Sequence, residues 1–272
     1  MFAATLAKTS EPILDRSMKG RIVKKAERTQ PKNPNGLTLK QHVFPLRSIK
    51  RFVDQSGRVS VSDKLRGQVR PRAPDDILFC ARRAWDQRAE AGYMKQIEDR
   101  FQMTVQAIID GQAATILPEQ KPSIDSLFAL CYMRARYRDL DAQEIQLSGI
   151  MGSELSKAQE ENLEKNGYLF TRTGGKIPAR QLNGLQLQLR INGYAAELAA
   201  LTRWGVIRAQ AGEFIVPDVP VHTVIPLSPT FALISPAPDG VIVEQNLAEI
   251  NRSAMASSQA YFFARNLSHC PF

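Results

Sequence analysis

His42 is the residue whose type and neighbours best suit acid–base chemistry in this chain. An imidazole, with an ordinary pKa of about 6.5, can donate or accept a proton, or bind a metal, near neutral pH. Close to it in the sequence lie four cations: Lys40, Arg47, Lys50 and Arg51. Their charge would favour the neutral imidazole, and they could bind a phosphate. The segment is therefore a candidate for phosphate chemistry.

Asp218 is the carboxylate expected to work with His42. It lies between Pro217 and Pro220, at the expected end of a strand, where catalytic groups are common. It could orient the imidazole or hold a cation, and the two would then serve a phosphodiester hydrolase. In the structural alternative, His42 caps a turn and Asp218 fixes the Asp-Val-Pro loop through a hydrogen bond to its own backbone. Both interpretations stay open.

A third candidate feature is a run of arginines at alternate positions. Residues two apart on a helix point about 200° from one another, so only Arg134 and Arg138 share a face. This pair is a candidate for nucleic-acid contact. The alternative is a solvated surface, which is the usual fate of an isolated charge run.

Metal-binding patterns are sparse. The three histidines, His42, His222 and His269, have no zinc-ligand spacing, and no cofactor is evident. Magnesium stays open because it needs only one or two carboxylates plus substrate oxygens. No acidic cluster singles itself out for that role.

Positive charge is concentrated at one end of the chain. The first 72 residues carry 17 Lys and Arg against five Asp and Glu, a net +12, and the remaining 200 carry 19 against 22, a net −3. Residues 1–36 are predicted to form a basic, flexible arm, because polar residues lead to a breaker cluster at 31–36 before any hydrophobic periodicity begins. Such an arm would attract phosphate-rich polymers or another anionic surface.

The cysteines and the hydrophobic pattern indicate the cellular compartment in which the protein is expected. The cysteines, Cys80, Cys131 and Cys270, are odd in number and form no CxxC pair, which indicates reduced thiols. The N-terminus lacks the pattern of a secretory signal, and no apolar run approaches the roughly 18 residues that cross a bilayer. A cytoplasmic protein without a membrane segment is expected.

Periodicity predicts the elements that would position these residues. Asp75 and Asp76 are expected to open a helix running past Trp85, and residues 55–58 to turn a hairpin whose returning strand carries Val59 and Val61. Further helices are expected at 94–110, 123–138, 153–166, 181–204 and 247–259, with a strand at 260–264. The fold predicted is α+β: a helical central region, then a strand-rich C-terminal third, in one domain over 37–272.

Two patterns resemble a known family. Gln41-His42-Val43-Phe44-Pro45 is similar to the Gln-His-x-x-Pro signature of family 4238 of domains of unknown function, and residues 214–221 resemble its Phe-Ile-Thr-Ser-Asp-x-Pro-Val strand. Here Val216 and Pro217 replace the Thr-Ser pair, which removes two hydroxyls beside Asp218. The resemblance covers roughly residues 40–265, and the family implies no established activity.

Three classes of function remain. The first is an enzyme of nucleic-acid metabolism that uses His42 and Asp218. The second is a nucleic-acid-binding module without chemistry, for which the arm and the basic stretch over 40–72 suffice through counterion release. The third is an interaction factor whose basic arm folds onto an acidic protein partner. Whether the protein is an enzyme, and its oligomeric state, are open at this level.

Overall fold

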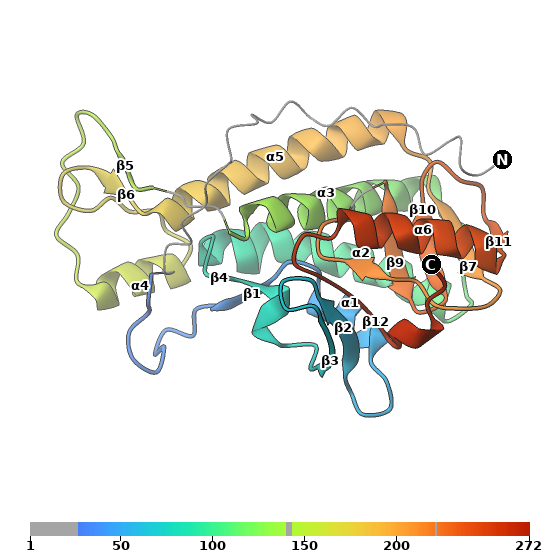
Figure 1. The fold of residues 1–272 in the computed structure, drawn as a ribbon. Helices are drawn as coiled ribbons and strands as arrows, with labels where there is room; N and C mark the ends of the chain where they lie inside the picture. Colours follow the sequence, from blue (N-terminus) through green and yellow to red (C-terminus); the bar gives the residue numbers. More distant parts are fainter. Residues whose placement is uncertain (1–26, 140–142, 221) are drawn as a thin grey trace.

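The computed structural model describes residues 27–139, 143–220 and 222–272. Helices form the centre, where α3 packs against α5 on one side and α2 on the other (Figure 1). The helices are α1 (Leu46–Ile49), α2 (Lys95–Ile109), α3 (Lys121–Tyr137), α4 (Lys157–Lys165), α5 (Ala179–Leu201) and α6 (Glu244–Ser257). Nearly every position of α3 from Ile124 to Arg134 is buried, so this helix is the centre of the core.

Two four-stranded sheets flank the helices. One has the order β11 (Gly240–Ile242), β7 (Gly205–Ala209), β10 (Phe231–Ile234), β9 (Val224–Ser228). The other has the order β3 (Gln68–Arg72), β2 (Val59–Asp63), β12 (Tyr261–Ala264), β8 (Val216–Pro217), and so joins segments that lie far apart in the sequence. Shorter ladders pair β1 (Lys40–His42) with β4 (Cys80–Arg82), and β5 (Ile145–Gln146) with β6 (Lys176–Ile177).

Aromatic rings join the second sheet to the rest of the core. Phe79 packs its ring 5.3 Å from both Tyr261 and Phe263, and Phe52 lies 5.8 Å from Phe263. All four rings are almost completely buried. Such edge-on pairs stabilise a core beyond the area they bury, by about 0.5–1.5 kcal/mol each.

The α+β prediction is confirmed, with helices in the centre and strands β7–β12 after α5. Helix α2 matches the expected 94–110, and Gly111 ends it with a φ of 71°. That positive φ is the backbone conformation that suits glycine.

Two local predictions are wrong. The segment after Asp75 forms a 3₁₀ turn (Ile77–Phe79) and then β4, not a helix. Residues 55–58 do turn, but they follow the 3₁₀ turn Lys50–Phe52, and the hairpin is instead β2–β3. In both places, pairing with a strand elsewhere in the chain outweighs the local pattern.

Part of the expected arm lies against the domain. Both the backbone N–H and the side-chain amide of Gln30 donate to the Glu161 carboxylate of α4, at 2.7 and 3.0 Å, and Asn35 donates to it at 3.3 Å. Residues 27–36 thus contact α4 directly. The expected flexible segment 1–26 lies outside the described residues.

Candidate nucleic-acid interface

His42 ends β1, opposite Cys80 of β4, and is half-buried. Its Nε2 lies 3.3 Å from the carbonyl oxygen of Pro74. Burial lowers the pKa of His42 below its ordinary value, although the Pro74 carbonyl and the Glu98 charge act in the opposite direction. The ring is therefore neutral at pH 7. If Nε2 donates to Pro74, Nδ1 keeps its lone pair, as a general base requires.

Arg134 lies beneath this strand in the core. Its side chain is 1% exposed and binds Glu98 at 2.5 Å and Glu90 at 3.1 Å. The same guanidinium donates to the His42 carbonyl oxygen at 3.0 Å and lies 5.6 Å from the Trp85 ring. The solvated surface expected for this arginine run is therefore wrong at Arg134. Because the side chain is buried and both terminal nitrogens are occupied internally, Arg134 has no surface to offer a phosphate, and it is not part of the interface.

Arg138 also turns inward. Its guanidinium lies 5.5 Å above the Tyr261 ring and pairs with Asp139 at 3.4 Å, leaving the side chain 16% exposed. The predicted shared face of Arg134 and Arg138 is present, but it faces the core. A positive side chain above a buried ring serves packing through a cation–π contact.

Asp218 is buried and accepts three backbone hydrogen bonds. Its carboxylate receives the N–H groups of Gln259 and Ala260, both at 2.8 Å, and of Tyr261 at 3.4 Å. It therefore fixes the start of β12. Among the described residues no hydrogen bond joins Asp218 to His42, so Asp218 is not in place to orient the imidazole. This contact agrees better with the structural alternative, in which Asp218 fixes the backbone, than with the catalytic one. The backbone that it holds is the start of β12 and not the Asp-Val-Pro loop.

Arg47 and Arg51 give the clearest sign of an anion site. They stand four residues apart across α1 and the following 3₁₀ turn. Both terminal nitrogens of Arg51 are shielded from water and have no hydrogen-bond acceptor among the described residues. Burial lowers the pKa of Arg51 to about 10, and the Arg47 charge adds to this, while Asp110 opposes it. A guanidinium in this state gains free energy from any oxyanion that reaches it.

The remaining predicted cations surround this pair. Lys50 is exposed on the 3₁₀ turn, and Lys40 is exposed on β1, where its ammonium donates to the Asp75 carbonyl oxygen at 2.9 Å. The β2–β3 hairpin adds Arg66 and Arg70, which belong to the basic stretch over 40–72 but were not singled out as contact residues. β3 is an edge strand with most residues exposed.

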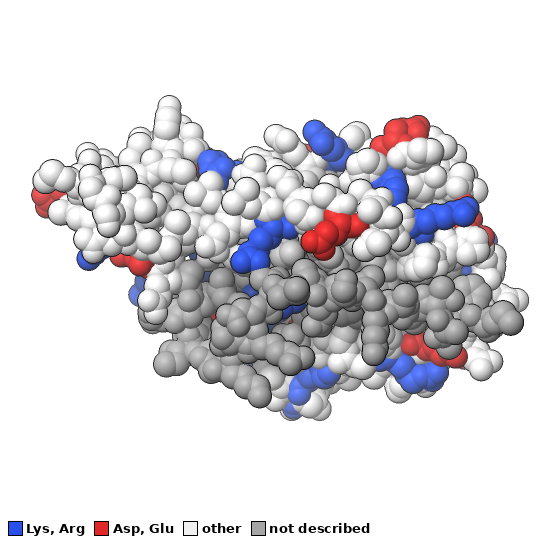
Figure 2. All heavy atoms as spheres, turned by 90° about the horizontal axis from the view of Figure 1, so that it is seen from above, with Lys and Arg blue, Asp and Glu red and all other residues white. Residues whose placement is uncertain are grey.

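This basic region lies below the helices in the view of Figure 1. Figure 2 shows the opposite face, on the α5 side, where the Lys and Arg side chains of the described residues stand singly among Asp and Glu. No single-sign patch is visible among the described residues of that face. The exposed cations of β1, α1 and the β2–β3 hairpin make that face the candidate interface.

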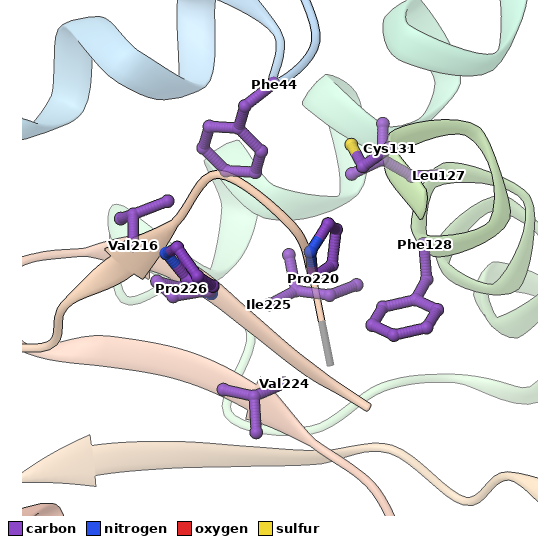
Figure 3. A pocket seen from close by; sticks show the side chains of 10 residues that line it. Phe44, Leu127, Phe128, Cys131, Val216, Pro220, Val224, Ile225 and Pro226 are labelled. Carbon is purple, nitrogen blue, oxygen red and sulfur yellow. The ribbon is translucent and has the colours of Figure 1, made fainter. Parts of the chain in front are cut away.

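The hollow in Figure 3 is a packing gap and not a reaction site. It lies between Phe44, α3 and the β8–β9 region, and its lining is apolar. Its free volume is about 20 Å³, room for roughly one water molecule. Cys131 faces it, but burial raises the pKa of that thiol to about 12, which removes it as a nucleophile.

Neither a cluster of metal ligands nor a membrane-spanning helix is found in the part of the chain that the structure describes. It contains no group of three or more His, Cys, Asp or Glu side chains arranged to hold a metal ion. Likewise, none of the helices in 27–139, 143–220 and 222–272 has both the length and the apolar character to cross a bilayer. Comparison of the chain with family models, curated proteins and solved structures gives no match.

Proposed function

We propose that the protein binds nucleic acid through the face formed by β1, α1 and the β2–β3 hairpin. The exposed Lys40, Arg47 and Lys50 would contact phosphates of the backbone directly, and Arg51 would join them once its shielded guanidinium turns outward. The observation that carries this proposal is the buried Arg51 guanidinium, which has no acceptor among the described residues and lies near a second arginine. Backbone phosphates supply repeated oxyanions that would satisfy such groups.

A polymer suits this surface better than a single small anion. The exposed cations extend from β1 through α1 to the hairpin, and residues 1–72 carry a net +12. Each phosphate that a cation neutralises releases condensed counterions, so affinity accumulates along the polymer and depends on salt. An acidic protein partner is the alternative, and titration with nucleic acid separates the two.

Hydrolysis of the bound phosphodiester is a second candidate function, favoured by His42. The imidazole is neutral at pH 7, and the bond to Pro74 would leave Nδ1 free to accept a proton. Magnesium held by substrate oxygens would fit this hypothesis. Asp218 drops out as the partner because its oxygens bind the start of β12.

The test is a titration of labelled single- and double-stranded DNA and RNA at several salt concentrations. Arg51→Met should weaken binding and lower the salt slope by about 0.9 for each duplex phosphate that the variant no longer neutralises. Arg252→Met, which removes an exposed positive charge from α6, is the matched control. Equal effects of the two variants, or no binding at low salt, would contradict the proposal and point to an acidic protein.

Integrity of the polymer is checked after each titration with and without magnesium. Cleavage that disappears in His42→Gln would support hydrolysis, whereas tight binding to intact polymer would leave a binding module.

A cytoplasmic setting is part of the proposal. It is supported by Cys80, Cys131 and Cys270, which are free and buried in the structure.

A further inference from the structure

A second set of cations surrounds the carboxylate of Glu27, and most of them lie far from the proposed interface in sequence. Lys157 Nζ lies 2.5 Å and Arg172 NH2 2.7 Å from its Oε1, and Arg180 pairs with its Oε2. Arg83 donates to its backbone carbonyl at 3.3 Å. These cations come from α4, α5, the segment before β6, and the residue after β4. Four separate segments thus converge on one residue.

The balance between the cations and the carboxylates of this cluster indicates the charge of the ligand that it would bind. Three other carboxylates take part: Glu160 pairs with Arg172, Glu164 pairs with Arg83 and Arg180, and Glu144 pairs with Arg172. Four cations therefore face three fixed carboxylates, which leaves one positive charge. Glu27 supplies the single negative charge that balances it. A monoanion in the place of Glu27 would keep this balance of paired charges.

The cluster also contains hydrogen-bond donors that Glu27 does not use. Arg83 and Arg180 are 3% and 4% exposed, and Arg83 Nε and one terminal nitrogen of Arg180 have no acceptor among the described residues. Burial alone would raise the pKa of Glu27, but Arg180, Lys157 and Arg172 together lower it to about 2. The surroundings thus strongly favour an anion, while two buried donors remain unsatisfied.

We propose that Lys157, Arg172 and Arg180 form a phosphodiester-binding site that Glu27 occupies in this structure. A phosphodiester carries one negative charge shared by two non-bridging oxygens, as a carboxylate does, and these oxygens accept hydrogen bonds from guanidinium and ammonium groups. Its binding requires Glu27 to leave, together with the neighbouring Gln30 that is held by Glu161. This inference deepens the proposed nucleic-acid function and rests on it only for the source of the phosphodiester.

Dimethyl phosphate is the probe, followed by phosphorus NMR line broadening with the full chain. Glu27→Ala should bind it at least about tenfold more tightly than the unmodified chain, a difference of about 1.4 kcal/mol. Adding Lys157→Met should reverse the gain. Glu144→Ala is the matched control, because Glu144 also pairs with Arg172 and is 39% exposed against 38% for Glu27.

Equal binding by the Glu27 and Glu144 variants would overturn the proposal, as would a gain that Lys157→Met leaves intact. If Glu27→Ala proves unfolded by circular dichroism, Glu27→Gln removes only the charge and gives the same test. Dimethyl phosphate has no base, so its binding does not depend on the proposed interface. Failure of duplex binding with retained probe binding would sink the proposed function alone.

The source of the phosphodiester is tested with the same Glu27→Ala variant. Its affinity for a single-stranded oligonucleotide should rise, and its affinity for phosphatidylglycerol vesicles should not. A rise for vesicles alone would overturn the assignment to nucleic acid.

Discussion

Arg134 donates a hydrogen bond of 3.0 Å to the carbonyl oxygen of His42, so an arginine considered for phosphate contact supports the strand that carries the candidate base. The Glu90 and Glu98 carboxylates complete its surroundings. The ion cluster joins α3, α2 and β1 at one point. Its removal should therefore affect the fold before it affects any ligand.

Arg134→Met should lower the free energy of unfolding by up to about 3–5 kcal/mol, the cost of breaking a buried ion pair. The lower part of that range is expected, because Glu90 and Glu98 keep 15% and 24% exposure and regain some water. Urea denaturation measures the change. Arg136→Met is the control, and equal stability of the two variants would contradict the role assigned to Arg134.

Stability should depend on the titration of His42. Its pKa is lowered in the folded state by burial, so the unfolded chain takes up the proton more readily. The contribution of the neutral ring is then present above the ordinary pKa of about 6.5 and is lost as pH falls from there toward the folded-state pKa. Between pH 7.5 and 5.5, the parent chain should lose more stability in urea denaturation than His42→Gln. Parallel curves would count against the burial effect.

Asp218→Ala should destabilise the fold by about 1–3 kcal/mol or more, because buried N–H groups at the start of β12 would lose their acceptor. Asp218→Asn keeps one acceptor oxygen and should be less destabilised. Denaturation of both variants is the measurement. Unchanged stability with a loss of polymer cleavage would restore Asp218 to a catalytic role.

Two glycines of α5 should respond in opposite directions to alanine. A Cβ at Gly184 would lie 2.0 Å from Oδ1 of Asp86, which is 2% exposed and accepts the Ala89 N–H, so it cannot move freely. Gly184→Ala should cost about 1–3 kcal/mol through overpacking. Gly193 has no neighbour within 4 Å of such an atom, and Gly193→Ala should stabilise the helix by up to about 1 kcal/mol. If both alanine variants were more stable than the parent chain, the Asp86 side chain would have moved aside to make room for the new Cβ at position 184.

The elements that local pattern predicts well are those with long periodicity. Helix α2 is predictable because its apolar stripe and Gly111 coincide, and α3 and α5 follow within a few residues. β4 escapes prediction because its apolar spacing also fits a helix. What decides its structure is pairing with β1 and the φ of 48° at Arg83, which breaks a helix. Neither is visible in the local sequence.

Some residues of the candidate site can likewise be named from the sequence, and others cannot. Arg47 and Arg51 can be named from sequence because they lie within ten residues of His42. The partners of Asp218 cannot, since they lie at residues 259–261, beyond α6. The cluster around Glu27 escapes sequence reasoning entirely, because Lys157, Arg172 and Arg180 are ordinary charges until the chain brings them together.

The position of β12 between β2 and β8 determines the order in which the protein can fold as it is synthesised. β2 is made before the central helices, yet one of its two sheet neighbours is Tyr261–Ala264, which leaves the ribosome only after α2 to α6. Until then Phe52 and Phe79 lack the rings of Tyr261 and Phe263 that cover them. Pairings so distant in sequence form slowly. A nascent chain would therefore complete the synthesis of α2 to α6 before this sheet could close.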